Sequence, residues 1–138
     1  MSRPIALVVA PFRSRTEGEA ERTDRAIEEL LGAGFVPVFL PYALDRFLDD
    51  DDEAGRAVAL EASEAFVRRI ASSPRGVALF VLRGRRSEGM RRDEQAWCDE
   101  RSARGYAGYV FALPESGSPE LSELGALELE RVLGLVSG

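Results

Sequence analysis

Histidine, lysine and asparagine are absent from this 138-residue chain, and all 18 of its cationic side chains are arginines. Without histidine, the chain cannot form a Ser-His-Asp or Cys-His catalytic arrangement or bind zinc through imidazole. Without lysine, it can form no internal Schiff base and has no P-loop lysine. Any chemistry must therefore use carboxylates, hydroxyls, phenols, arginines or backbone dipoles.

Cysteine and long apolar runs are also scarce. Cys98 is the only cysteine, which excludes a disulfide framework and a CxxC site and is typical of a reducing cytoplasm. The longest apolar runs have the length of strands, far below the roughly 20 residues that span a bilayer, so we expect no signal peptide and no membrane anchor. The net charge of -6 disfavours a duplex nucleic-acid partner, which normally requires a basic face. We therefore expect a cytoplasmic protein.

Four apolar runs alternate along the chain with four stretches of helical periodicity. The expected strands are residues 5–10, 35–40, 77–82 and 106–113, and the expected helices are residues 17–31, 58–70, 90–104 and 121–136. This alternation predicts one α/β domain over residues 1–138, a three-layer sandwich with a parallel sheet of four or five strands. Pro37 cannot donate a ladder hydrogen bond, which places the second strand at the rim. The strand order 2-1-3-4, flavodoxin-like or Rossmann-like, is then the simplest solution.

Several local signals refine this outline. Thr16 and Glu19 have the spacing of a capping box at the start of the first helix. Met90, Trp97 and Cys98 are expected to point inward from the third helix. A polar connection is expected over residues 41–53, ending in four consecutive aspartates and a glutamate. These acids suit the N-terminus of a helix better than a calcium loop, which needs alternating ligands and a glycine. We expect no metal and no other cofactor.

A ligand site is predicted at two loops. In doubly wound sheets, ligands bind beyond the carboxyl ends of the strands where the strand order reverses, here at residues 11–16 and 83–90. These loops combine arginines, hydroxyls and glycines next to helix N-termini, which suits an anion such as a phosphate. The residues concerned are Arg13, Arg15, Arg83, Arg85, Arg86, Ser14, Ser87, Gly84 and Gly89. The alternative is that the arginines only solubilise the surface.

Two carboxylates follow the second loop. Asp93 and Glu94 lie near the expected start of the third helix, where acids commonly complement the helix dipole. Alternatively, one of them projects into the cleft as a nucleophile or base, because a carboxylate is the common remaining candidate in a chain without histidine and lysine.

Parts of the sequence resemble the nucleoside 2-deoxyribosyltransferase-like proteins. The similar stretches, within residues 5–112, are Val-Val-Ala-Pro-Phe-Arg at 8–13, Gly-Phe-Val-Pro-Val-Phe-Leu-Pro-Tyr at 34–42, Val-Leu-Arg-Gly at 81–84, Ser-Glu-Gly at 87–89 and Glu-Gln-Ala at 94–96. In that family a Ser-x-Gly turn precedes a catalytic glutamate on the following helix. The resemblance implies a carboxylate that attacks the anomeric carbon of a nucleoside or nucleotide.

Carried over by position, the resemblance assigns a role to each stretch. Glu94 becomes the nucleophile and Ser87 and Gly89 hold the sugar or its phosphate. The residues that line the floor are Ala10, Pro11, Phe12 and Arg13. Four departures from the family accompany this assignment, and the first is that Ala10 stands where the family has a turn glycine. Phe12 lacks the phenol that often orients the nucleophile, Asp93 stands where the family spacing expects the glutamate, and Arg75-Gly76 replaces an acid before the third strand. Asp45 or Asp49 could supply that acid.

Three functions remain open. The first is a nucleoside or nucleotide N-glycosidase or deoxyribosyltransferase with a small-molecule substrate. The second is a catalytically silent nucleotide- or phosphate-binding module, and the third is a protein-interaction domain. Because the sheet has two open edges and the expected C-terminal helix is rich in leucine, we also expect a homodimer.

Overall fold

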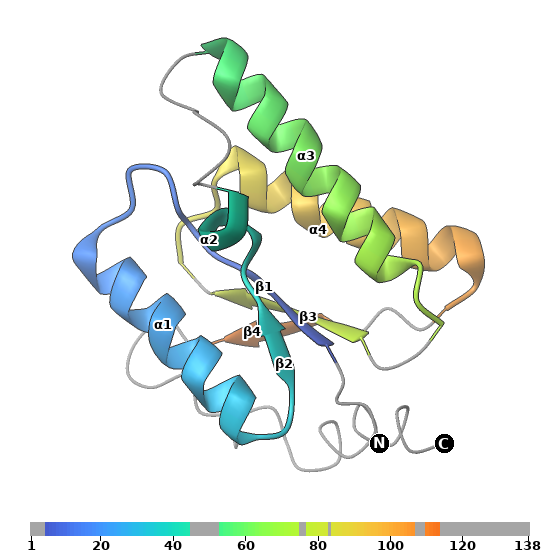
Figure 1. The fold of residues 1–138 in the computed structure, drawn as a ribbon, viewed down its shortest axis with the longest axis horizontal. Coiled ribbons are helices and arrows are strands. Elements are labelled where there is room, and N and C mark those ends of the chain that lie inside the picture. Colours follow the sequence, from blue (N-terminus) through green and yellow to red (C-terminus); the bar gives the residue numbers. More distant parts are fainter. Residues whose placement is uncertain (1–4, 45–52, 75–76, 83, 107–109, 114–138) are drawn as a thin grey trace.

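A parallel sheet with helices on both faces forms the centre of the molecule (Figure 1). The computed structural model describes residues 5–44, 53–74, 77–82, 84–106 and 110–113. Within these residues the strands are β1 (Ile5–Val9), β2 (Val36–Val38), β3 (Val77–Leu82) and β4 (Val110–Leu113), and the helices are α1 (Glu17–Gly32), α2 (Leu40–Leu44), α3 (Glu53–Ala71) and α4 (Glu88–Arg104). The strand order β2-β1-β3-β4, all parallel, confirms the predicted α/β sandwich and its order 2-1-3-4.

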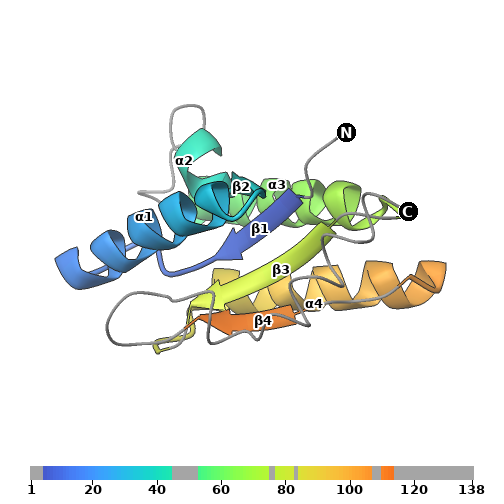
Figure 2. The same cartoon turned by 90° about the horizontal axis from the view of Figure 1, so that it is seen from below.

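The alternation of side chains along the central strands builds two cores. Ala6 and Val8 of β1 pack with α1 on one face, whereas Leu7 and Val9 pack with α3 and α4 on the other. Figure 1 shows α1 on one side of the sheet and the other two long helices on the opposite side. Figure 2 shows α3 and α4 running behind the strands. A strand buried on both faces reads as a continuous apolar run, which explains why β1 and β3 were predictable.

Caps fix the helix ends that flank the site. Thr16 N–H donates to Glu19 Oε1 at 2.8 Å and Glu19 N–H donates to Thr16 Oγ1 at 3.1 Å, which confirms the predicted capping box. Ser87 caps α4 by accepting the Met90 N–H at 3.3 Å. At the other end of α4, Gly105 closes the helix with a φ of 69°, a left-handed conformation that favours glycine.

Some local predictions were wrong. The second strand is shorter than residues 35–40, and Leu40–Leu44 forms a short helix where a polar connection was expected to begin. Cys98 is exposed, because the buried face of α4 continues from Trp97 to Arg101, one helical turn on. Cys98 is rotated from Trp97 by about 100°.

Other predictions fall on parts of the chain outside the described residues. These are the acidic run at 49–52, the expected helix at 121–136 and Arg83. In the part of the chain that the structure describes, no helix is both long enough and apolar enough to cross a membrane.

Candidate functional site

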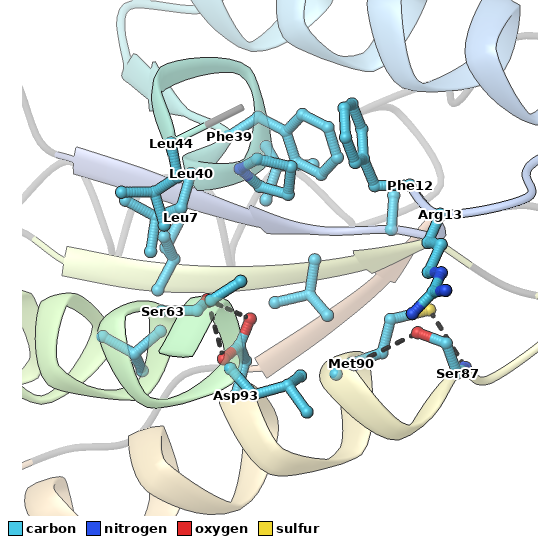
Figure 3. Close-up of a pocket in the computed structure, with 18 of the residues that line it drawn as sticks. Leu7, Phe12, Arg13, Phe39, Leu40, Leu44, Ser63, Ser87, Met90 and Asp93 are labelled. Atoms are coloured by element: carbon cyan, nitrogen blue, oxygen red, sulfur yellow. Dashed lines mark hydrogen bonds between the residues drawn. The ribbon is translucent and has the colours of Figure 1, made fainter. Parts of the chain in front are cut away.

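A pocket of about 310 Å³ lies beside β1 and between the two loops predicted to bind a ligand (Figure 3). Its lining comes from β1 and the loop after it, from α2 and α3, and from the first two turns of α4 together with the loop before it. This volume is within the range of small-molecule sites. The doubly wound topology therefore brings segments that are far apart in the sequence to one cavity.

Most of the pocket wall is apolar. Leu40 and Leu44 of α2 face the pocket from one side, and Met90 of α4 faces it from the other (Figure 3). Phe12 and Phe39 add aromatic surface, with ring centroids 6.2 Å apart in an edge-to-face arrangement. A wall of this kind can hold a flat, weakly polar group such as a nucleobase by burial and stacking.

Asp93 is the carboxylate that lies in this apolar surrounding. It projects from α4 toward α3, where the Ser63 hydroxyl lies 3.0 Å from Asp93 Oδ1 and 2.9 Å from Oδ2 (Figure 3). Burial raises the pKa of the Asp93 carboxyl from 3.8 to about 6, although the hydrogen bond from Ser63 lowers it. The negative charge of Glu64 raises this pKa and the positive charge of Arg92 lowers it, both to a smaller extent. A carboxylate whose pKa lies near neutrality is typical of acid, base or nucleophilic chemistry.

The helix register decides between Asp93 and Glu94. Since α4 begins at Glu88, Asp93 lies in its second turn, beyond the free N–H groups that a dipole-complementing acid would cap. Glu94 is rotated by about 100° from Asp93 and pairs with Arg86 instead of lining the pocket. The structure thus brings Asp93, and not Glu94, to the cavity.

Three arginines stand at the pocket. Arg85 pairs with the buried Glu19 at 3.2 Å, and Arg56 of α3 lies 3.6 Å from Glu88. Arg13 is exposed, and among the described residues no carboxylate lies within ion-pairing distance of it. The pocket therefore combines an apolar interior with a cationic group that is ready to pair with an anionic ligand.

Arg15, also predicted for the anion-binding loop, has a different environment. Its guanidinium lies 5.0 Å from the Phe12 ring centroid and 5.2 Å from that of Tyr42. It also donates to the Tyr42 hydroxyl at 3.1 Å, and that hydroxyl donates to Asp24 at 2.5 Å. Burial and the hydrogen bond to Asp24 raise the pKa of the Tyr42 phenol. These contacts hold Phe12 between α1 and α2 at the pocket.

The sequence-predicted residues divide between the pocket and its surroundings. Those that line the pocket are Ala10, Phe12, Arg13, Ser14, Arg85, Ser87, Gly89 and Asp93. Pro11, Gly84, Arg86 and Glu94 are not among the lining residues. Gly84 instead provides a turn with a φ of 121°, which is open to glycine and strained for other residues.

Sequence reasoning missed the contribution of α3. Arg56 and Ser63 line the pocket from this helix, far in the sequence from both predicted loops. One signal could have found Ser63: it follows Leu60 by three residues and precedes Val67 by four, so it interrupts the apolar face of the helix with a hydroxyl. A polar residue on a buried helical face requires a partner, and Asp93 is that partner.

The comparisons with known proteins give no relative for this site. No family model, curated protein or solved structure matches the chain. Within the described ranges, no three His, Cys, Asp or Glu side chains gather in a way that could hold a metal ion.

Proposed function

We propose that this protein cleaves the N-glycosidic bond of a nucleoside or nucleotide, with water or a second base as the acceptor of the sugar. The observation that carries the proposal is Asp93, a carboxylate with a pKa raised to about 6 by burial in an apolar pocket. Such a group is ionised at neutral pH yet poorly solvated, which favours its use as a nucleophile. The resemblance of the strand-loop-helix segments to the deoxyribosyltransferase-like proteins supports the same chemistry.

The proposed reaction has two steps and balances without a cofactor. An Asp93 carboxylate oxygen bonds to the anomeric carbon while the bond from that carbon to the base nitrogen breaks. The electron pair leaves with the base, which takes a proton from water. In the second step a water oxygen bonds to the anomeric carbon, the bond to Asp93 breaks with its electron pair returning to the carboxylate, and the water releases a proton. This sequence parallels retaining glycoside hydrolysis.

In this proposal the parts of the substrate lie against different walls of the pocket. The Phe12 ring offers a stacking surface for the base, and Arg13 and Arg85 lie on the side that would hold a 5′-phosphate. The N-terminus of α4, capped by Ser87, adds its positive end to this side. A phosphorylated nucleoside therefore fits the charges of the pocket better than an uncharged one.

Base release from a panel of nucleosides and nucleoside 5′-monophosphates tests the proposal. The wild-type protein is expected to release free base, Asp93→Ala to lose this activity, and Glu94→Ala to retain it. The two variants remove adjacent carboxylates from the same helix, so they control for charge and for helix stability. Absence of base from every member of the panel, or unchanged turnover in Asp93→Ala, would refute the proposal.

A second candidate is a silent nucleotide- or phosphate-binding module. The observation in its favour is that Asp93 is the one carboxylate among the described lining residues, whereas glycoside hydrolysis normally uses two. Asp45 and Asp49, which could supply the second acid, lie outside the described residues. The module predicts that nucleotides raise the melting temperature without release of base. Combined Arg13→Ala and Arg85→Ala substitution should remove the shift, and Arg91→Ala on the exposed side of α4 should leave it intact.

We further propose a homodimer in the cytoplasm. The sheet, as far as it is described, ends in the edge strands β2 and β4, and such edges favour association. The lone Cys98 is consistent with a reducing compartment. Light scattering of the full chain tests the dimer, and a monomer at micromolar concentration would contradict it.

A further inference from the structure

The nucleophile of the proposed reaction needs a partner that keeps its carboxylate oriented. Phe12 cannot do this because its ring carries no hydroxyl, and the nearest arginine in the sequence, Arg92, is engaged elsewhere. Arg92 Nε lies 2.5 Å from Glu64 Oε1 of α3. This ion pair holds the Arg92 guanidinium on Glu64, so another group must provide hydrogen bonds to Asp93.

The close approach of α3 and α4 supplies that group. A Cβ atom added at Gly89 would lie only 3.3 Å from Leu60 Cδ2, so the two helices meet tightly at the first turn of α4. Asp93 follows Gly89 by one helical turn, and Ser63 follows Leu60 by one turn, so the next pair along the same interface is Ser63 and Asp93. The role of Gly89 is therefore to bring the helices together as well as to line the pocket.

The contact between Ser63 and Asp93 involves both carboxylate oxygens. The Ser63 hydroxyl lies 3.0 Å from one oxygen and 2.9 Å from the other. Among the described residues, Ser63 is the one side chain that donates a hydrogen bond to Asp93. A single donor shared between both oxygens limits rotation of the carboxylate about its last bond and favours its ionised form.

We infer that Ser63 is the positioning residue of the site, and that its hydroxyl holds the Asp93 carboxylate in the orientation and the charge state needed for attack. This inference rests on the proposed function, because the orientation of Asp93 matters for attack only if Asp93 is the nucleophile. It also assigns a role to α3, a helix that contributes no residue to the sequence-predicted site.

Other charges act on Asp93 from the surrounding elements and must stay in place during a test. Glu64 of α3 and Arg92 of α4 act on the pKa of Asp93, and Arg56, Arg13 and Arg85 line the same pocket. Substitution of Ser63 changes none of them. A shift in the titration of Asp93 in a Ser63 variant therefore reports on the hydroxyl.

The test measures the titration of Asp93 by carbon NMR in the ligand-free protein, with Asp93→Asn used to identify its signal. Loss of a hydrogen bond to an ionised group is expected to raise the pKa of Asp93 by roughly one pH unit in Ser63→Ala. Ser63→Thr keeps a hydroxyl and should keep the wild-type titration. Ser72→Ala is the matched control, because Ser72 lies just beyond α3 and its hydroxyl donates to the Arg69 carbonyl at 2.6 Å.

Activity provides the second measurement. The rise of kcat/KM with pH should move to higher pH in Ser63→Ala by the same amount as the titration, and Ser63→Thr should restore it. An unchanged Asp93 titration in Ser63→Ala, or a Ser63→Thr protein that behaves like Ser63→Ala, would overturn the inference. If the wild-type protein releases no base, the proposed function fails, and the titration still decides whether Ser63 holds the carboxylate.

Discussion

Replacement of Asp93 by asparagine should stabilise the protein at neutral and alkaline pH. Asparagine keeps the shape of the side chain and removes a charge that burial disfavours. With a pKa of 3.8 in the unfolded chain and about 6 in the folded protein, the difference is about 2 pH units. At about 1.4 kcal/mol for each unit, ionisation of Asp93 costs about 3 kcal/mol of folding free energy.

The direction of the pH dependence follows from proton binding. Between pH 4 and 6 the folded protein binds the Asp93 proton more tightly than the unfolded chain does, so this group lowers the stability as the pH rises. The loss of stability from Asp93 ionisation is complete above the pKa of the folded protein and disappears below the pKa of the unfolded chain. At pH 8 the free energy of unfolding of Asp93→Asn should therefore exceed that of the wild type by up to about 3 kcal/mol, reduced by the weaker hydrogen bond from Ser63 to asparagine. Near pH 3.5 the two proteins should be almost equally stable.

Urea unfolding at pH 3.5, 6 and 8 measures this difference. Asp99→Asn is the matched control, since Asp99 is an exposed residue on the same helix that accepts a hydrogen bond from Gln95 at 2.7 Å. The control should change the stability by no more than about 0.5 kcal/mol at any pH. The reasoning would be refuted if Asp93→Asn were less stable than the wild type at pH 8. It would also be refuted if the difference in unfolding free energy between the two proteins were the same at pH 3.5 and at pH 8.

Two further predictions concern the frame that holds the site. Gly105→Ala should destabilise the protein by about 1 kcal/mol, because the φ of 69° at this position strains any residue with a Cβ atom. The control Gly32→Ala should cause no loss of stability, since nothing lies within 4 Å of the added Cβ atom. Equal unfolding midpoints for the two variants would contradict this. Arg101→Leu should cost about 2–4 kcal/mol in urea unfolding, because the buried guanidinium donates to carbonyls at the end of α3. Arg104→Leu on the exposed face is its control, and a loss as large there would show that burial is not the cause.

The fold was largely predictable because its signals are local. Each parallel strand is an apolar run, each long helix carries a periodic face, and Thr16 and Glu19 mark a helix start by their spacing alone. Pro37 has no backbone N–H group to donate to a neighbouring strand, which predicts that the second strand lies at the edge of the sheet. The short helix Leu40–Leu44 was not predictable in this way, because one helical turn is too short to show periodicity.

The site was predictable only in part, because it depends on packing. The two loops follow from the rule that ligands bind at the carboxyl ends of parallel strands. The choice between Asp93 and Glu94 depends on the register of α4, and a difference of one residue rotates a side chain by about 100°. The interruption of an apolar helix face could have singled out Ser63, but its pairing with Asp93 depends on the packing of α3 against α4, which joins residues 30 positions apart in the sequence.

Mapping the sugar adduct on the protein tests the central claim, that Asp93 is the nucleophile, most directly. A nucleoside 5′-monophosphate with fluorine at the 2′ position slows the second step, since fluorine destabilises the oxocarbenium-like transition state and removes the 2-hydroxyl interaction. After incubation, mass spectrometry of proteolytic fragments should show a stoichiometric sugar phosphate adduct on Asp93, with one equivalent of free base. An adduct on Glu94, or release of base by an Asp93→Ala protein at the wild-type rate, would contradict the account.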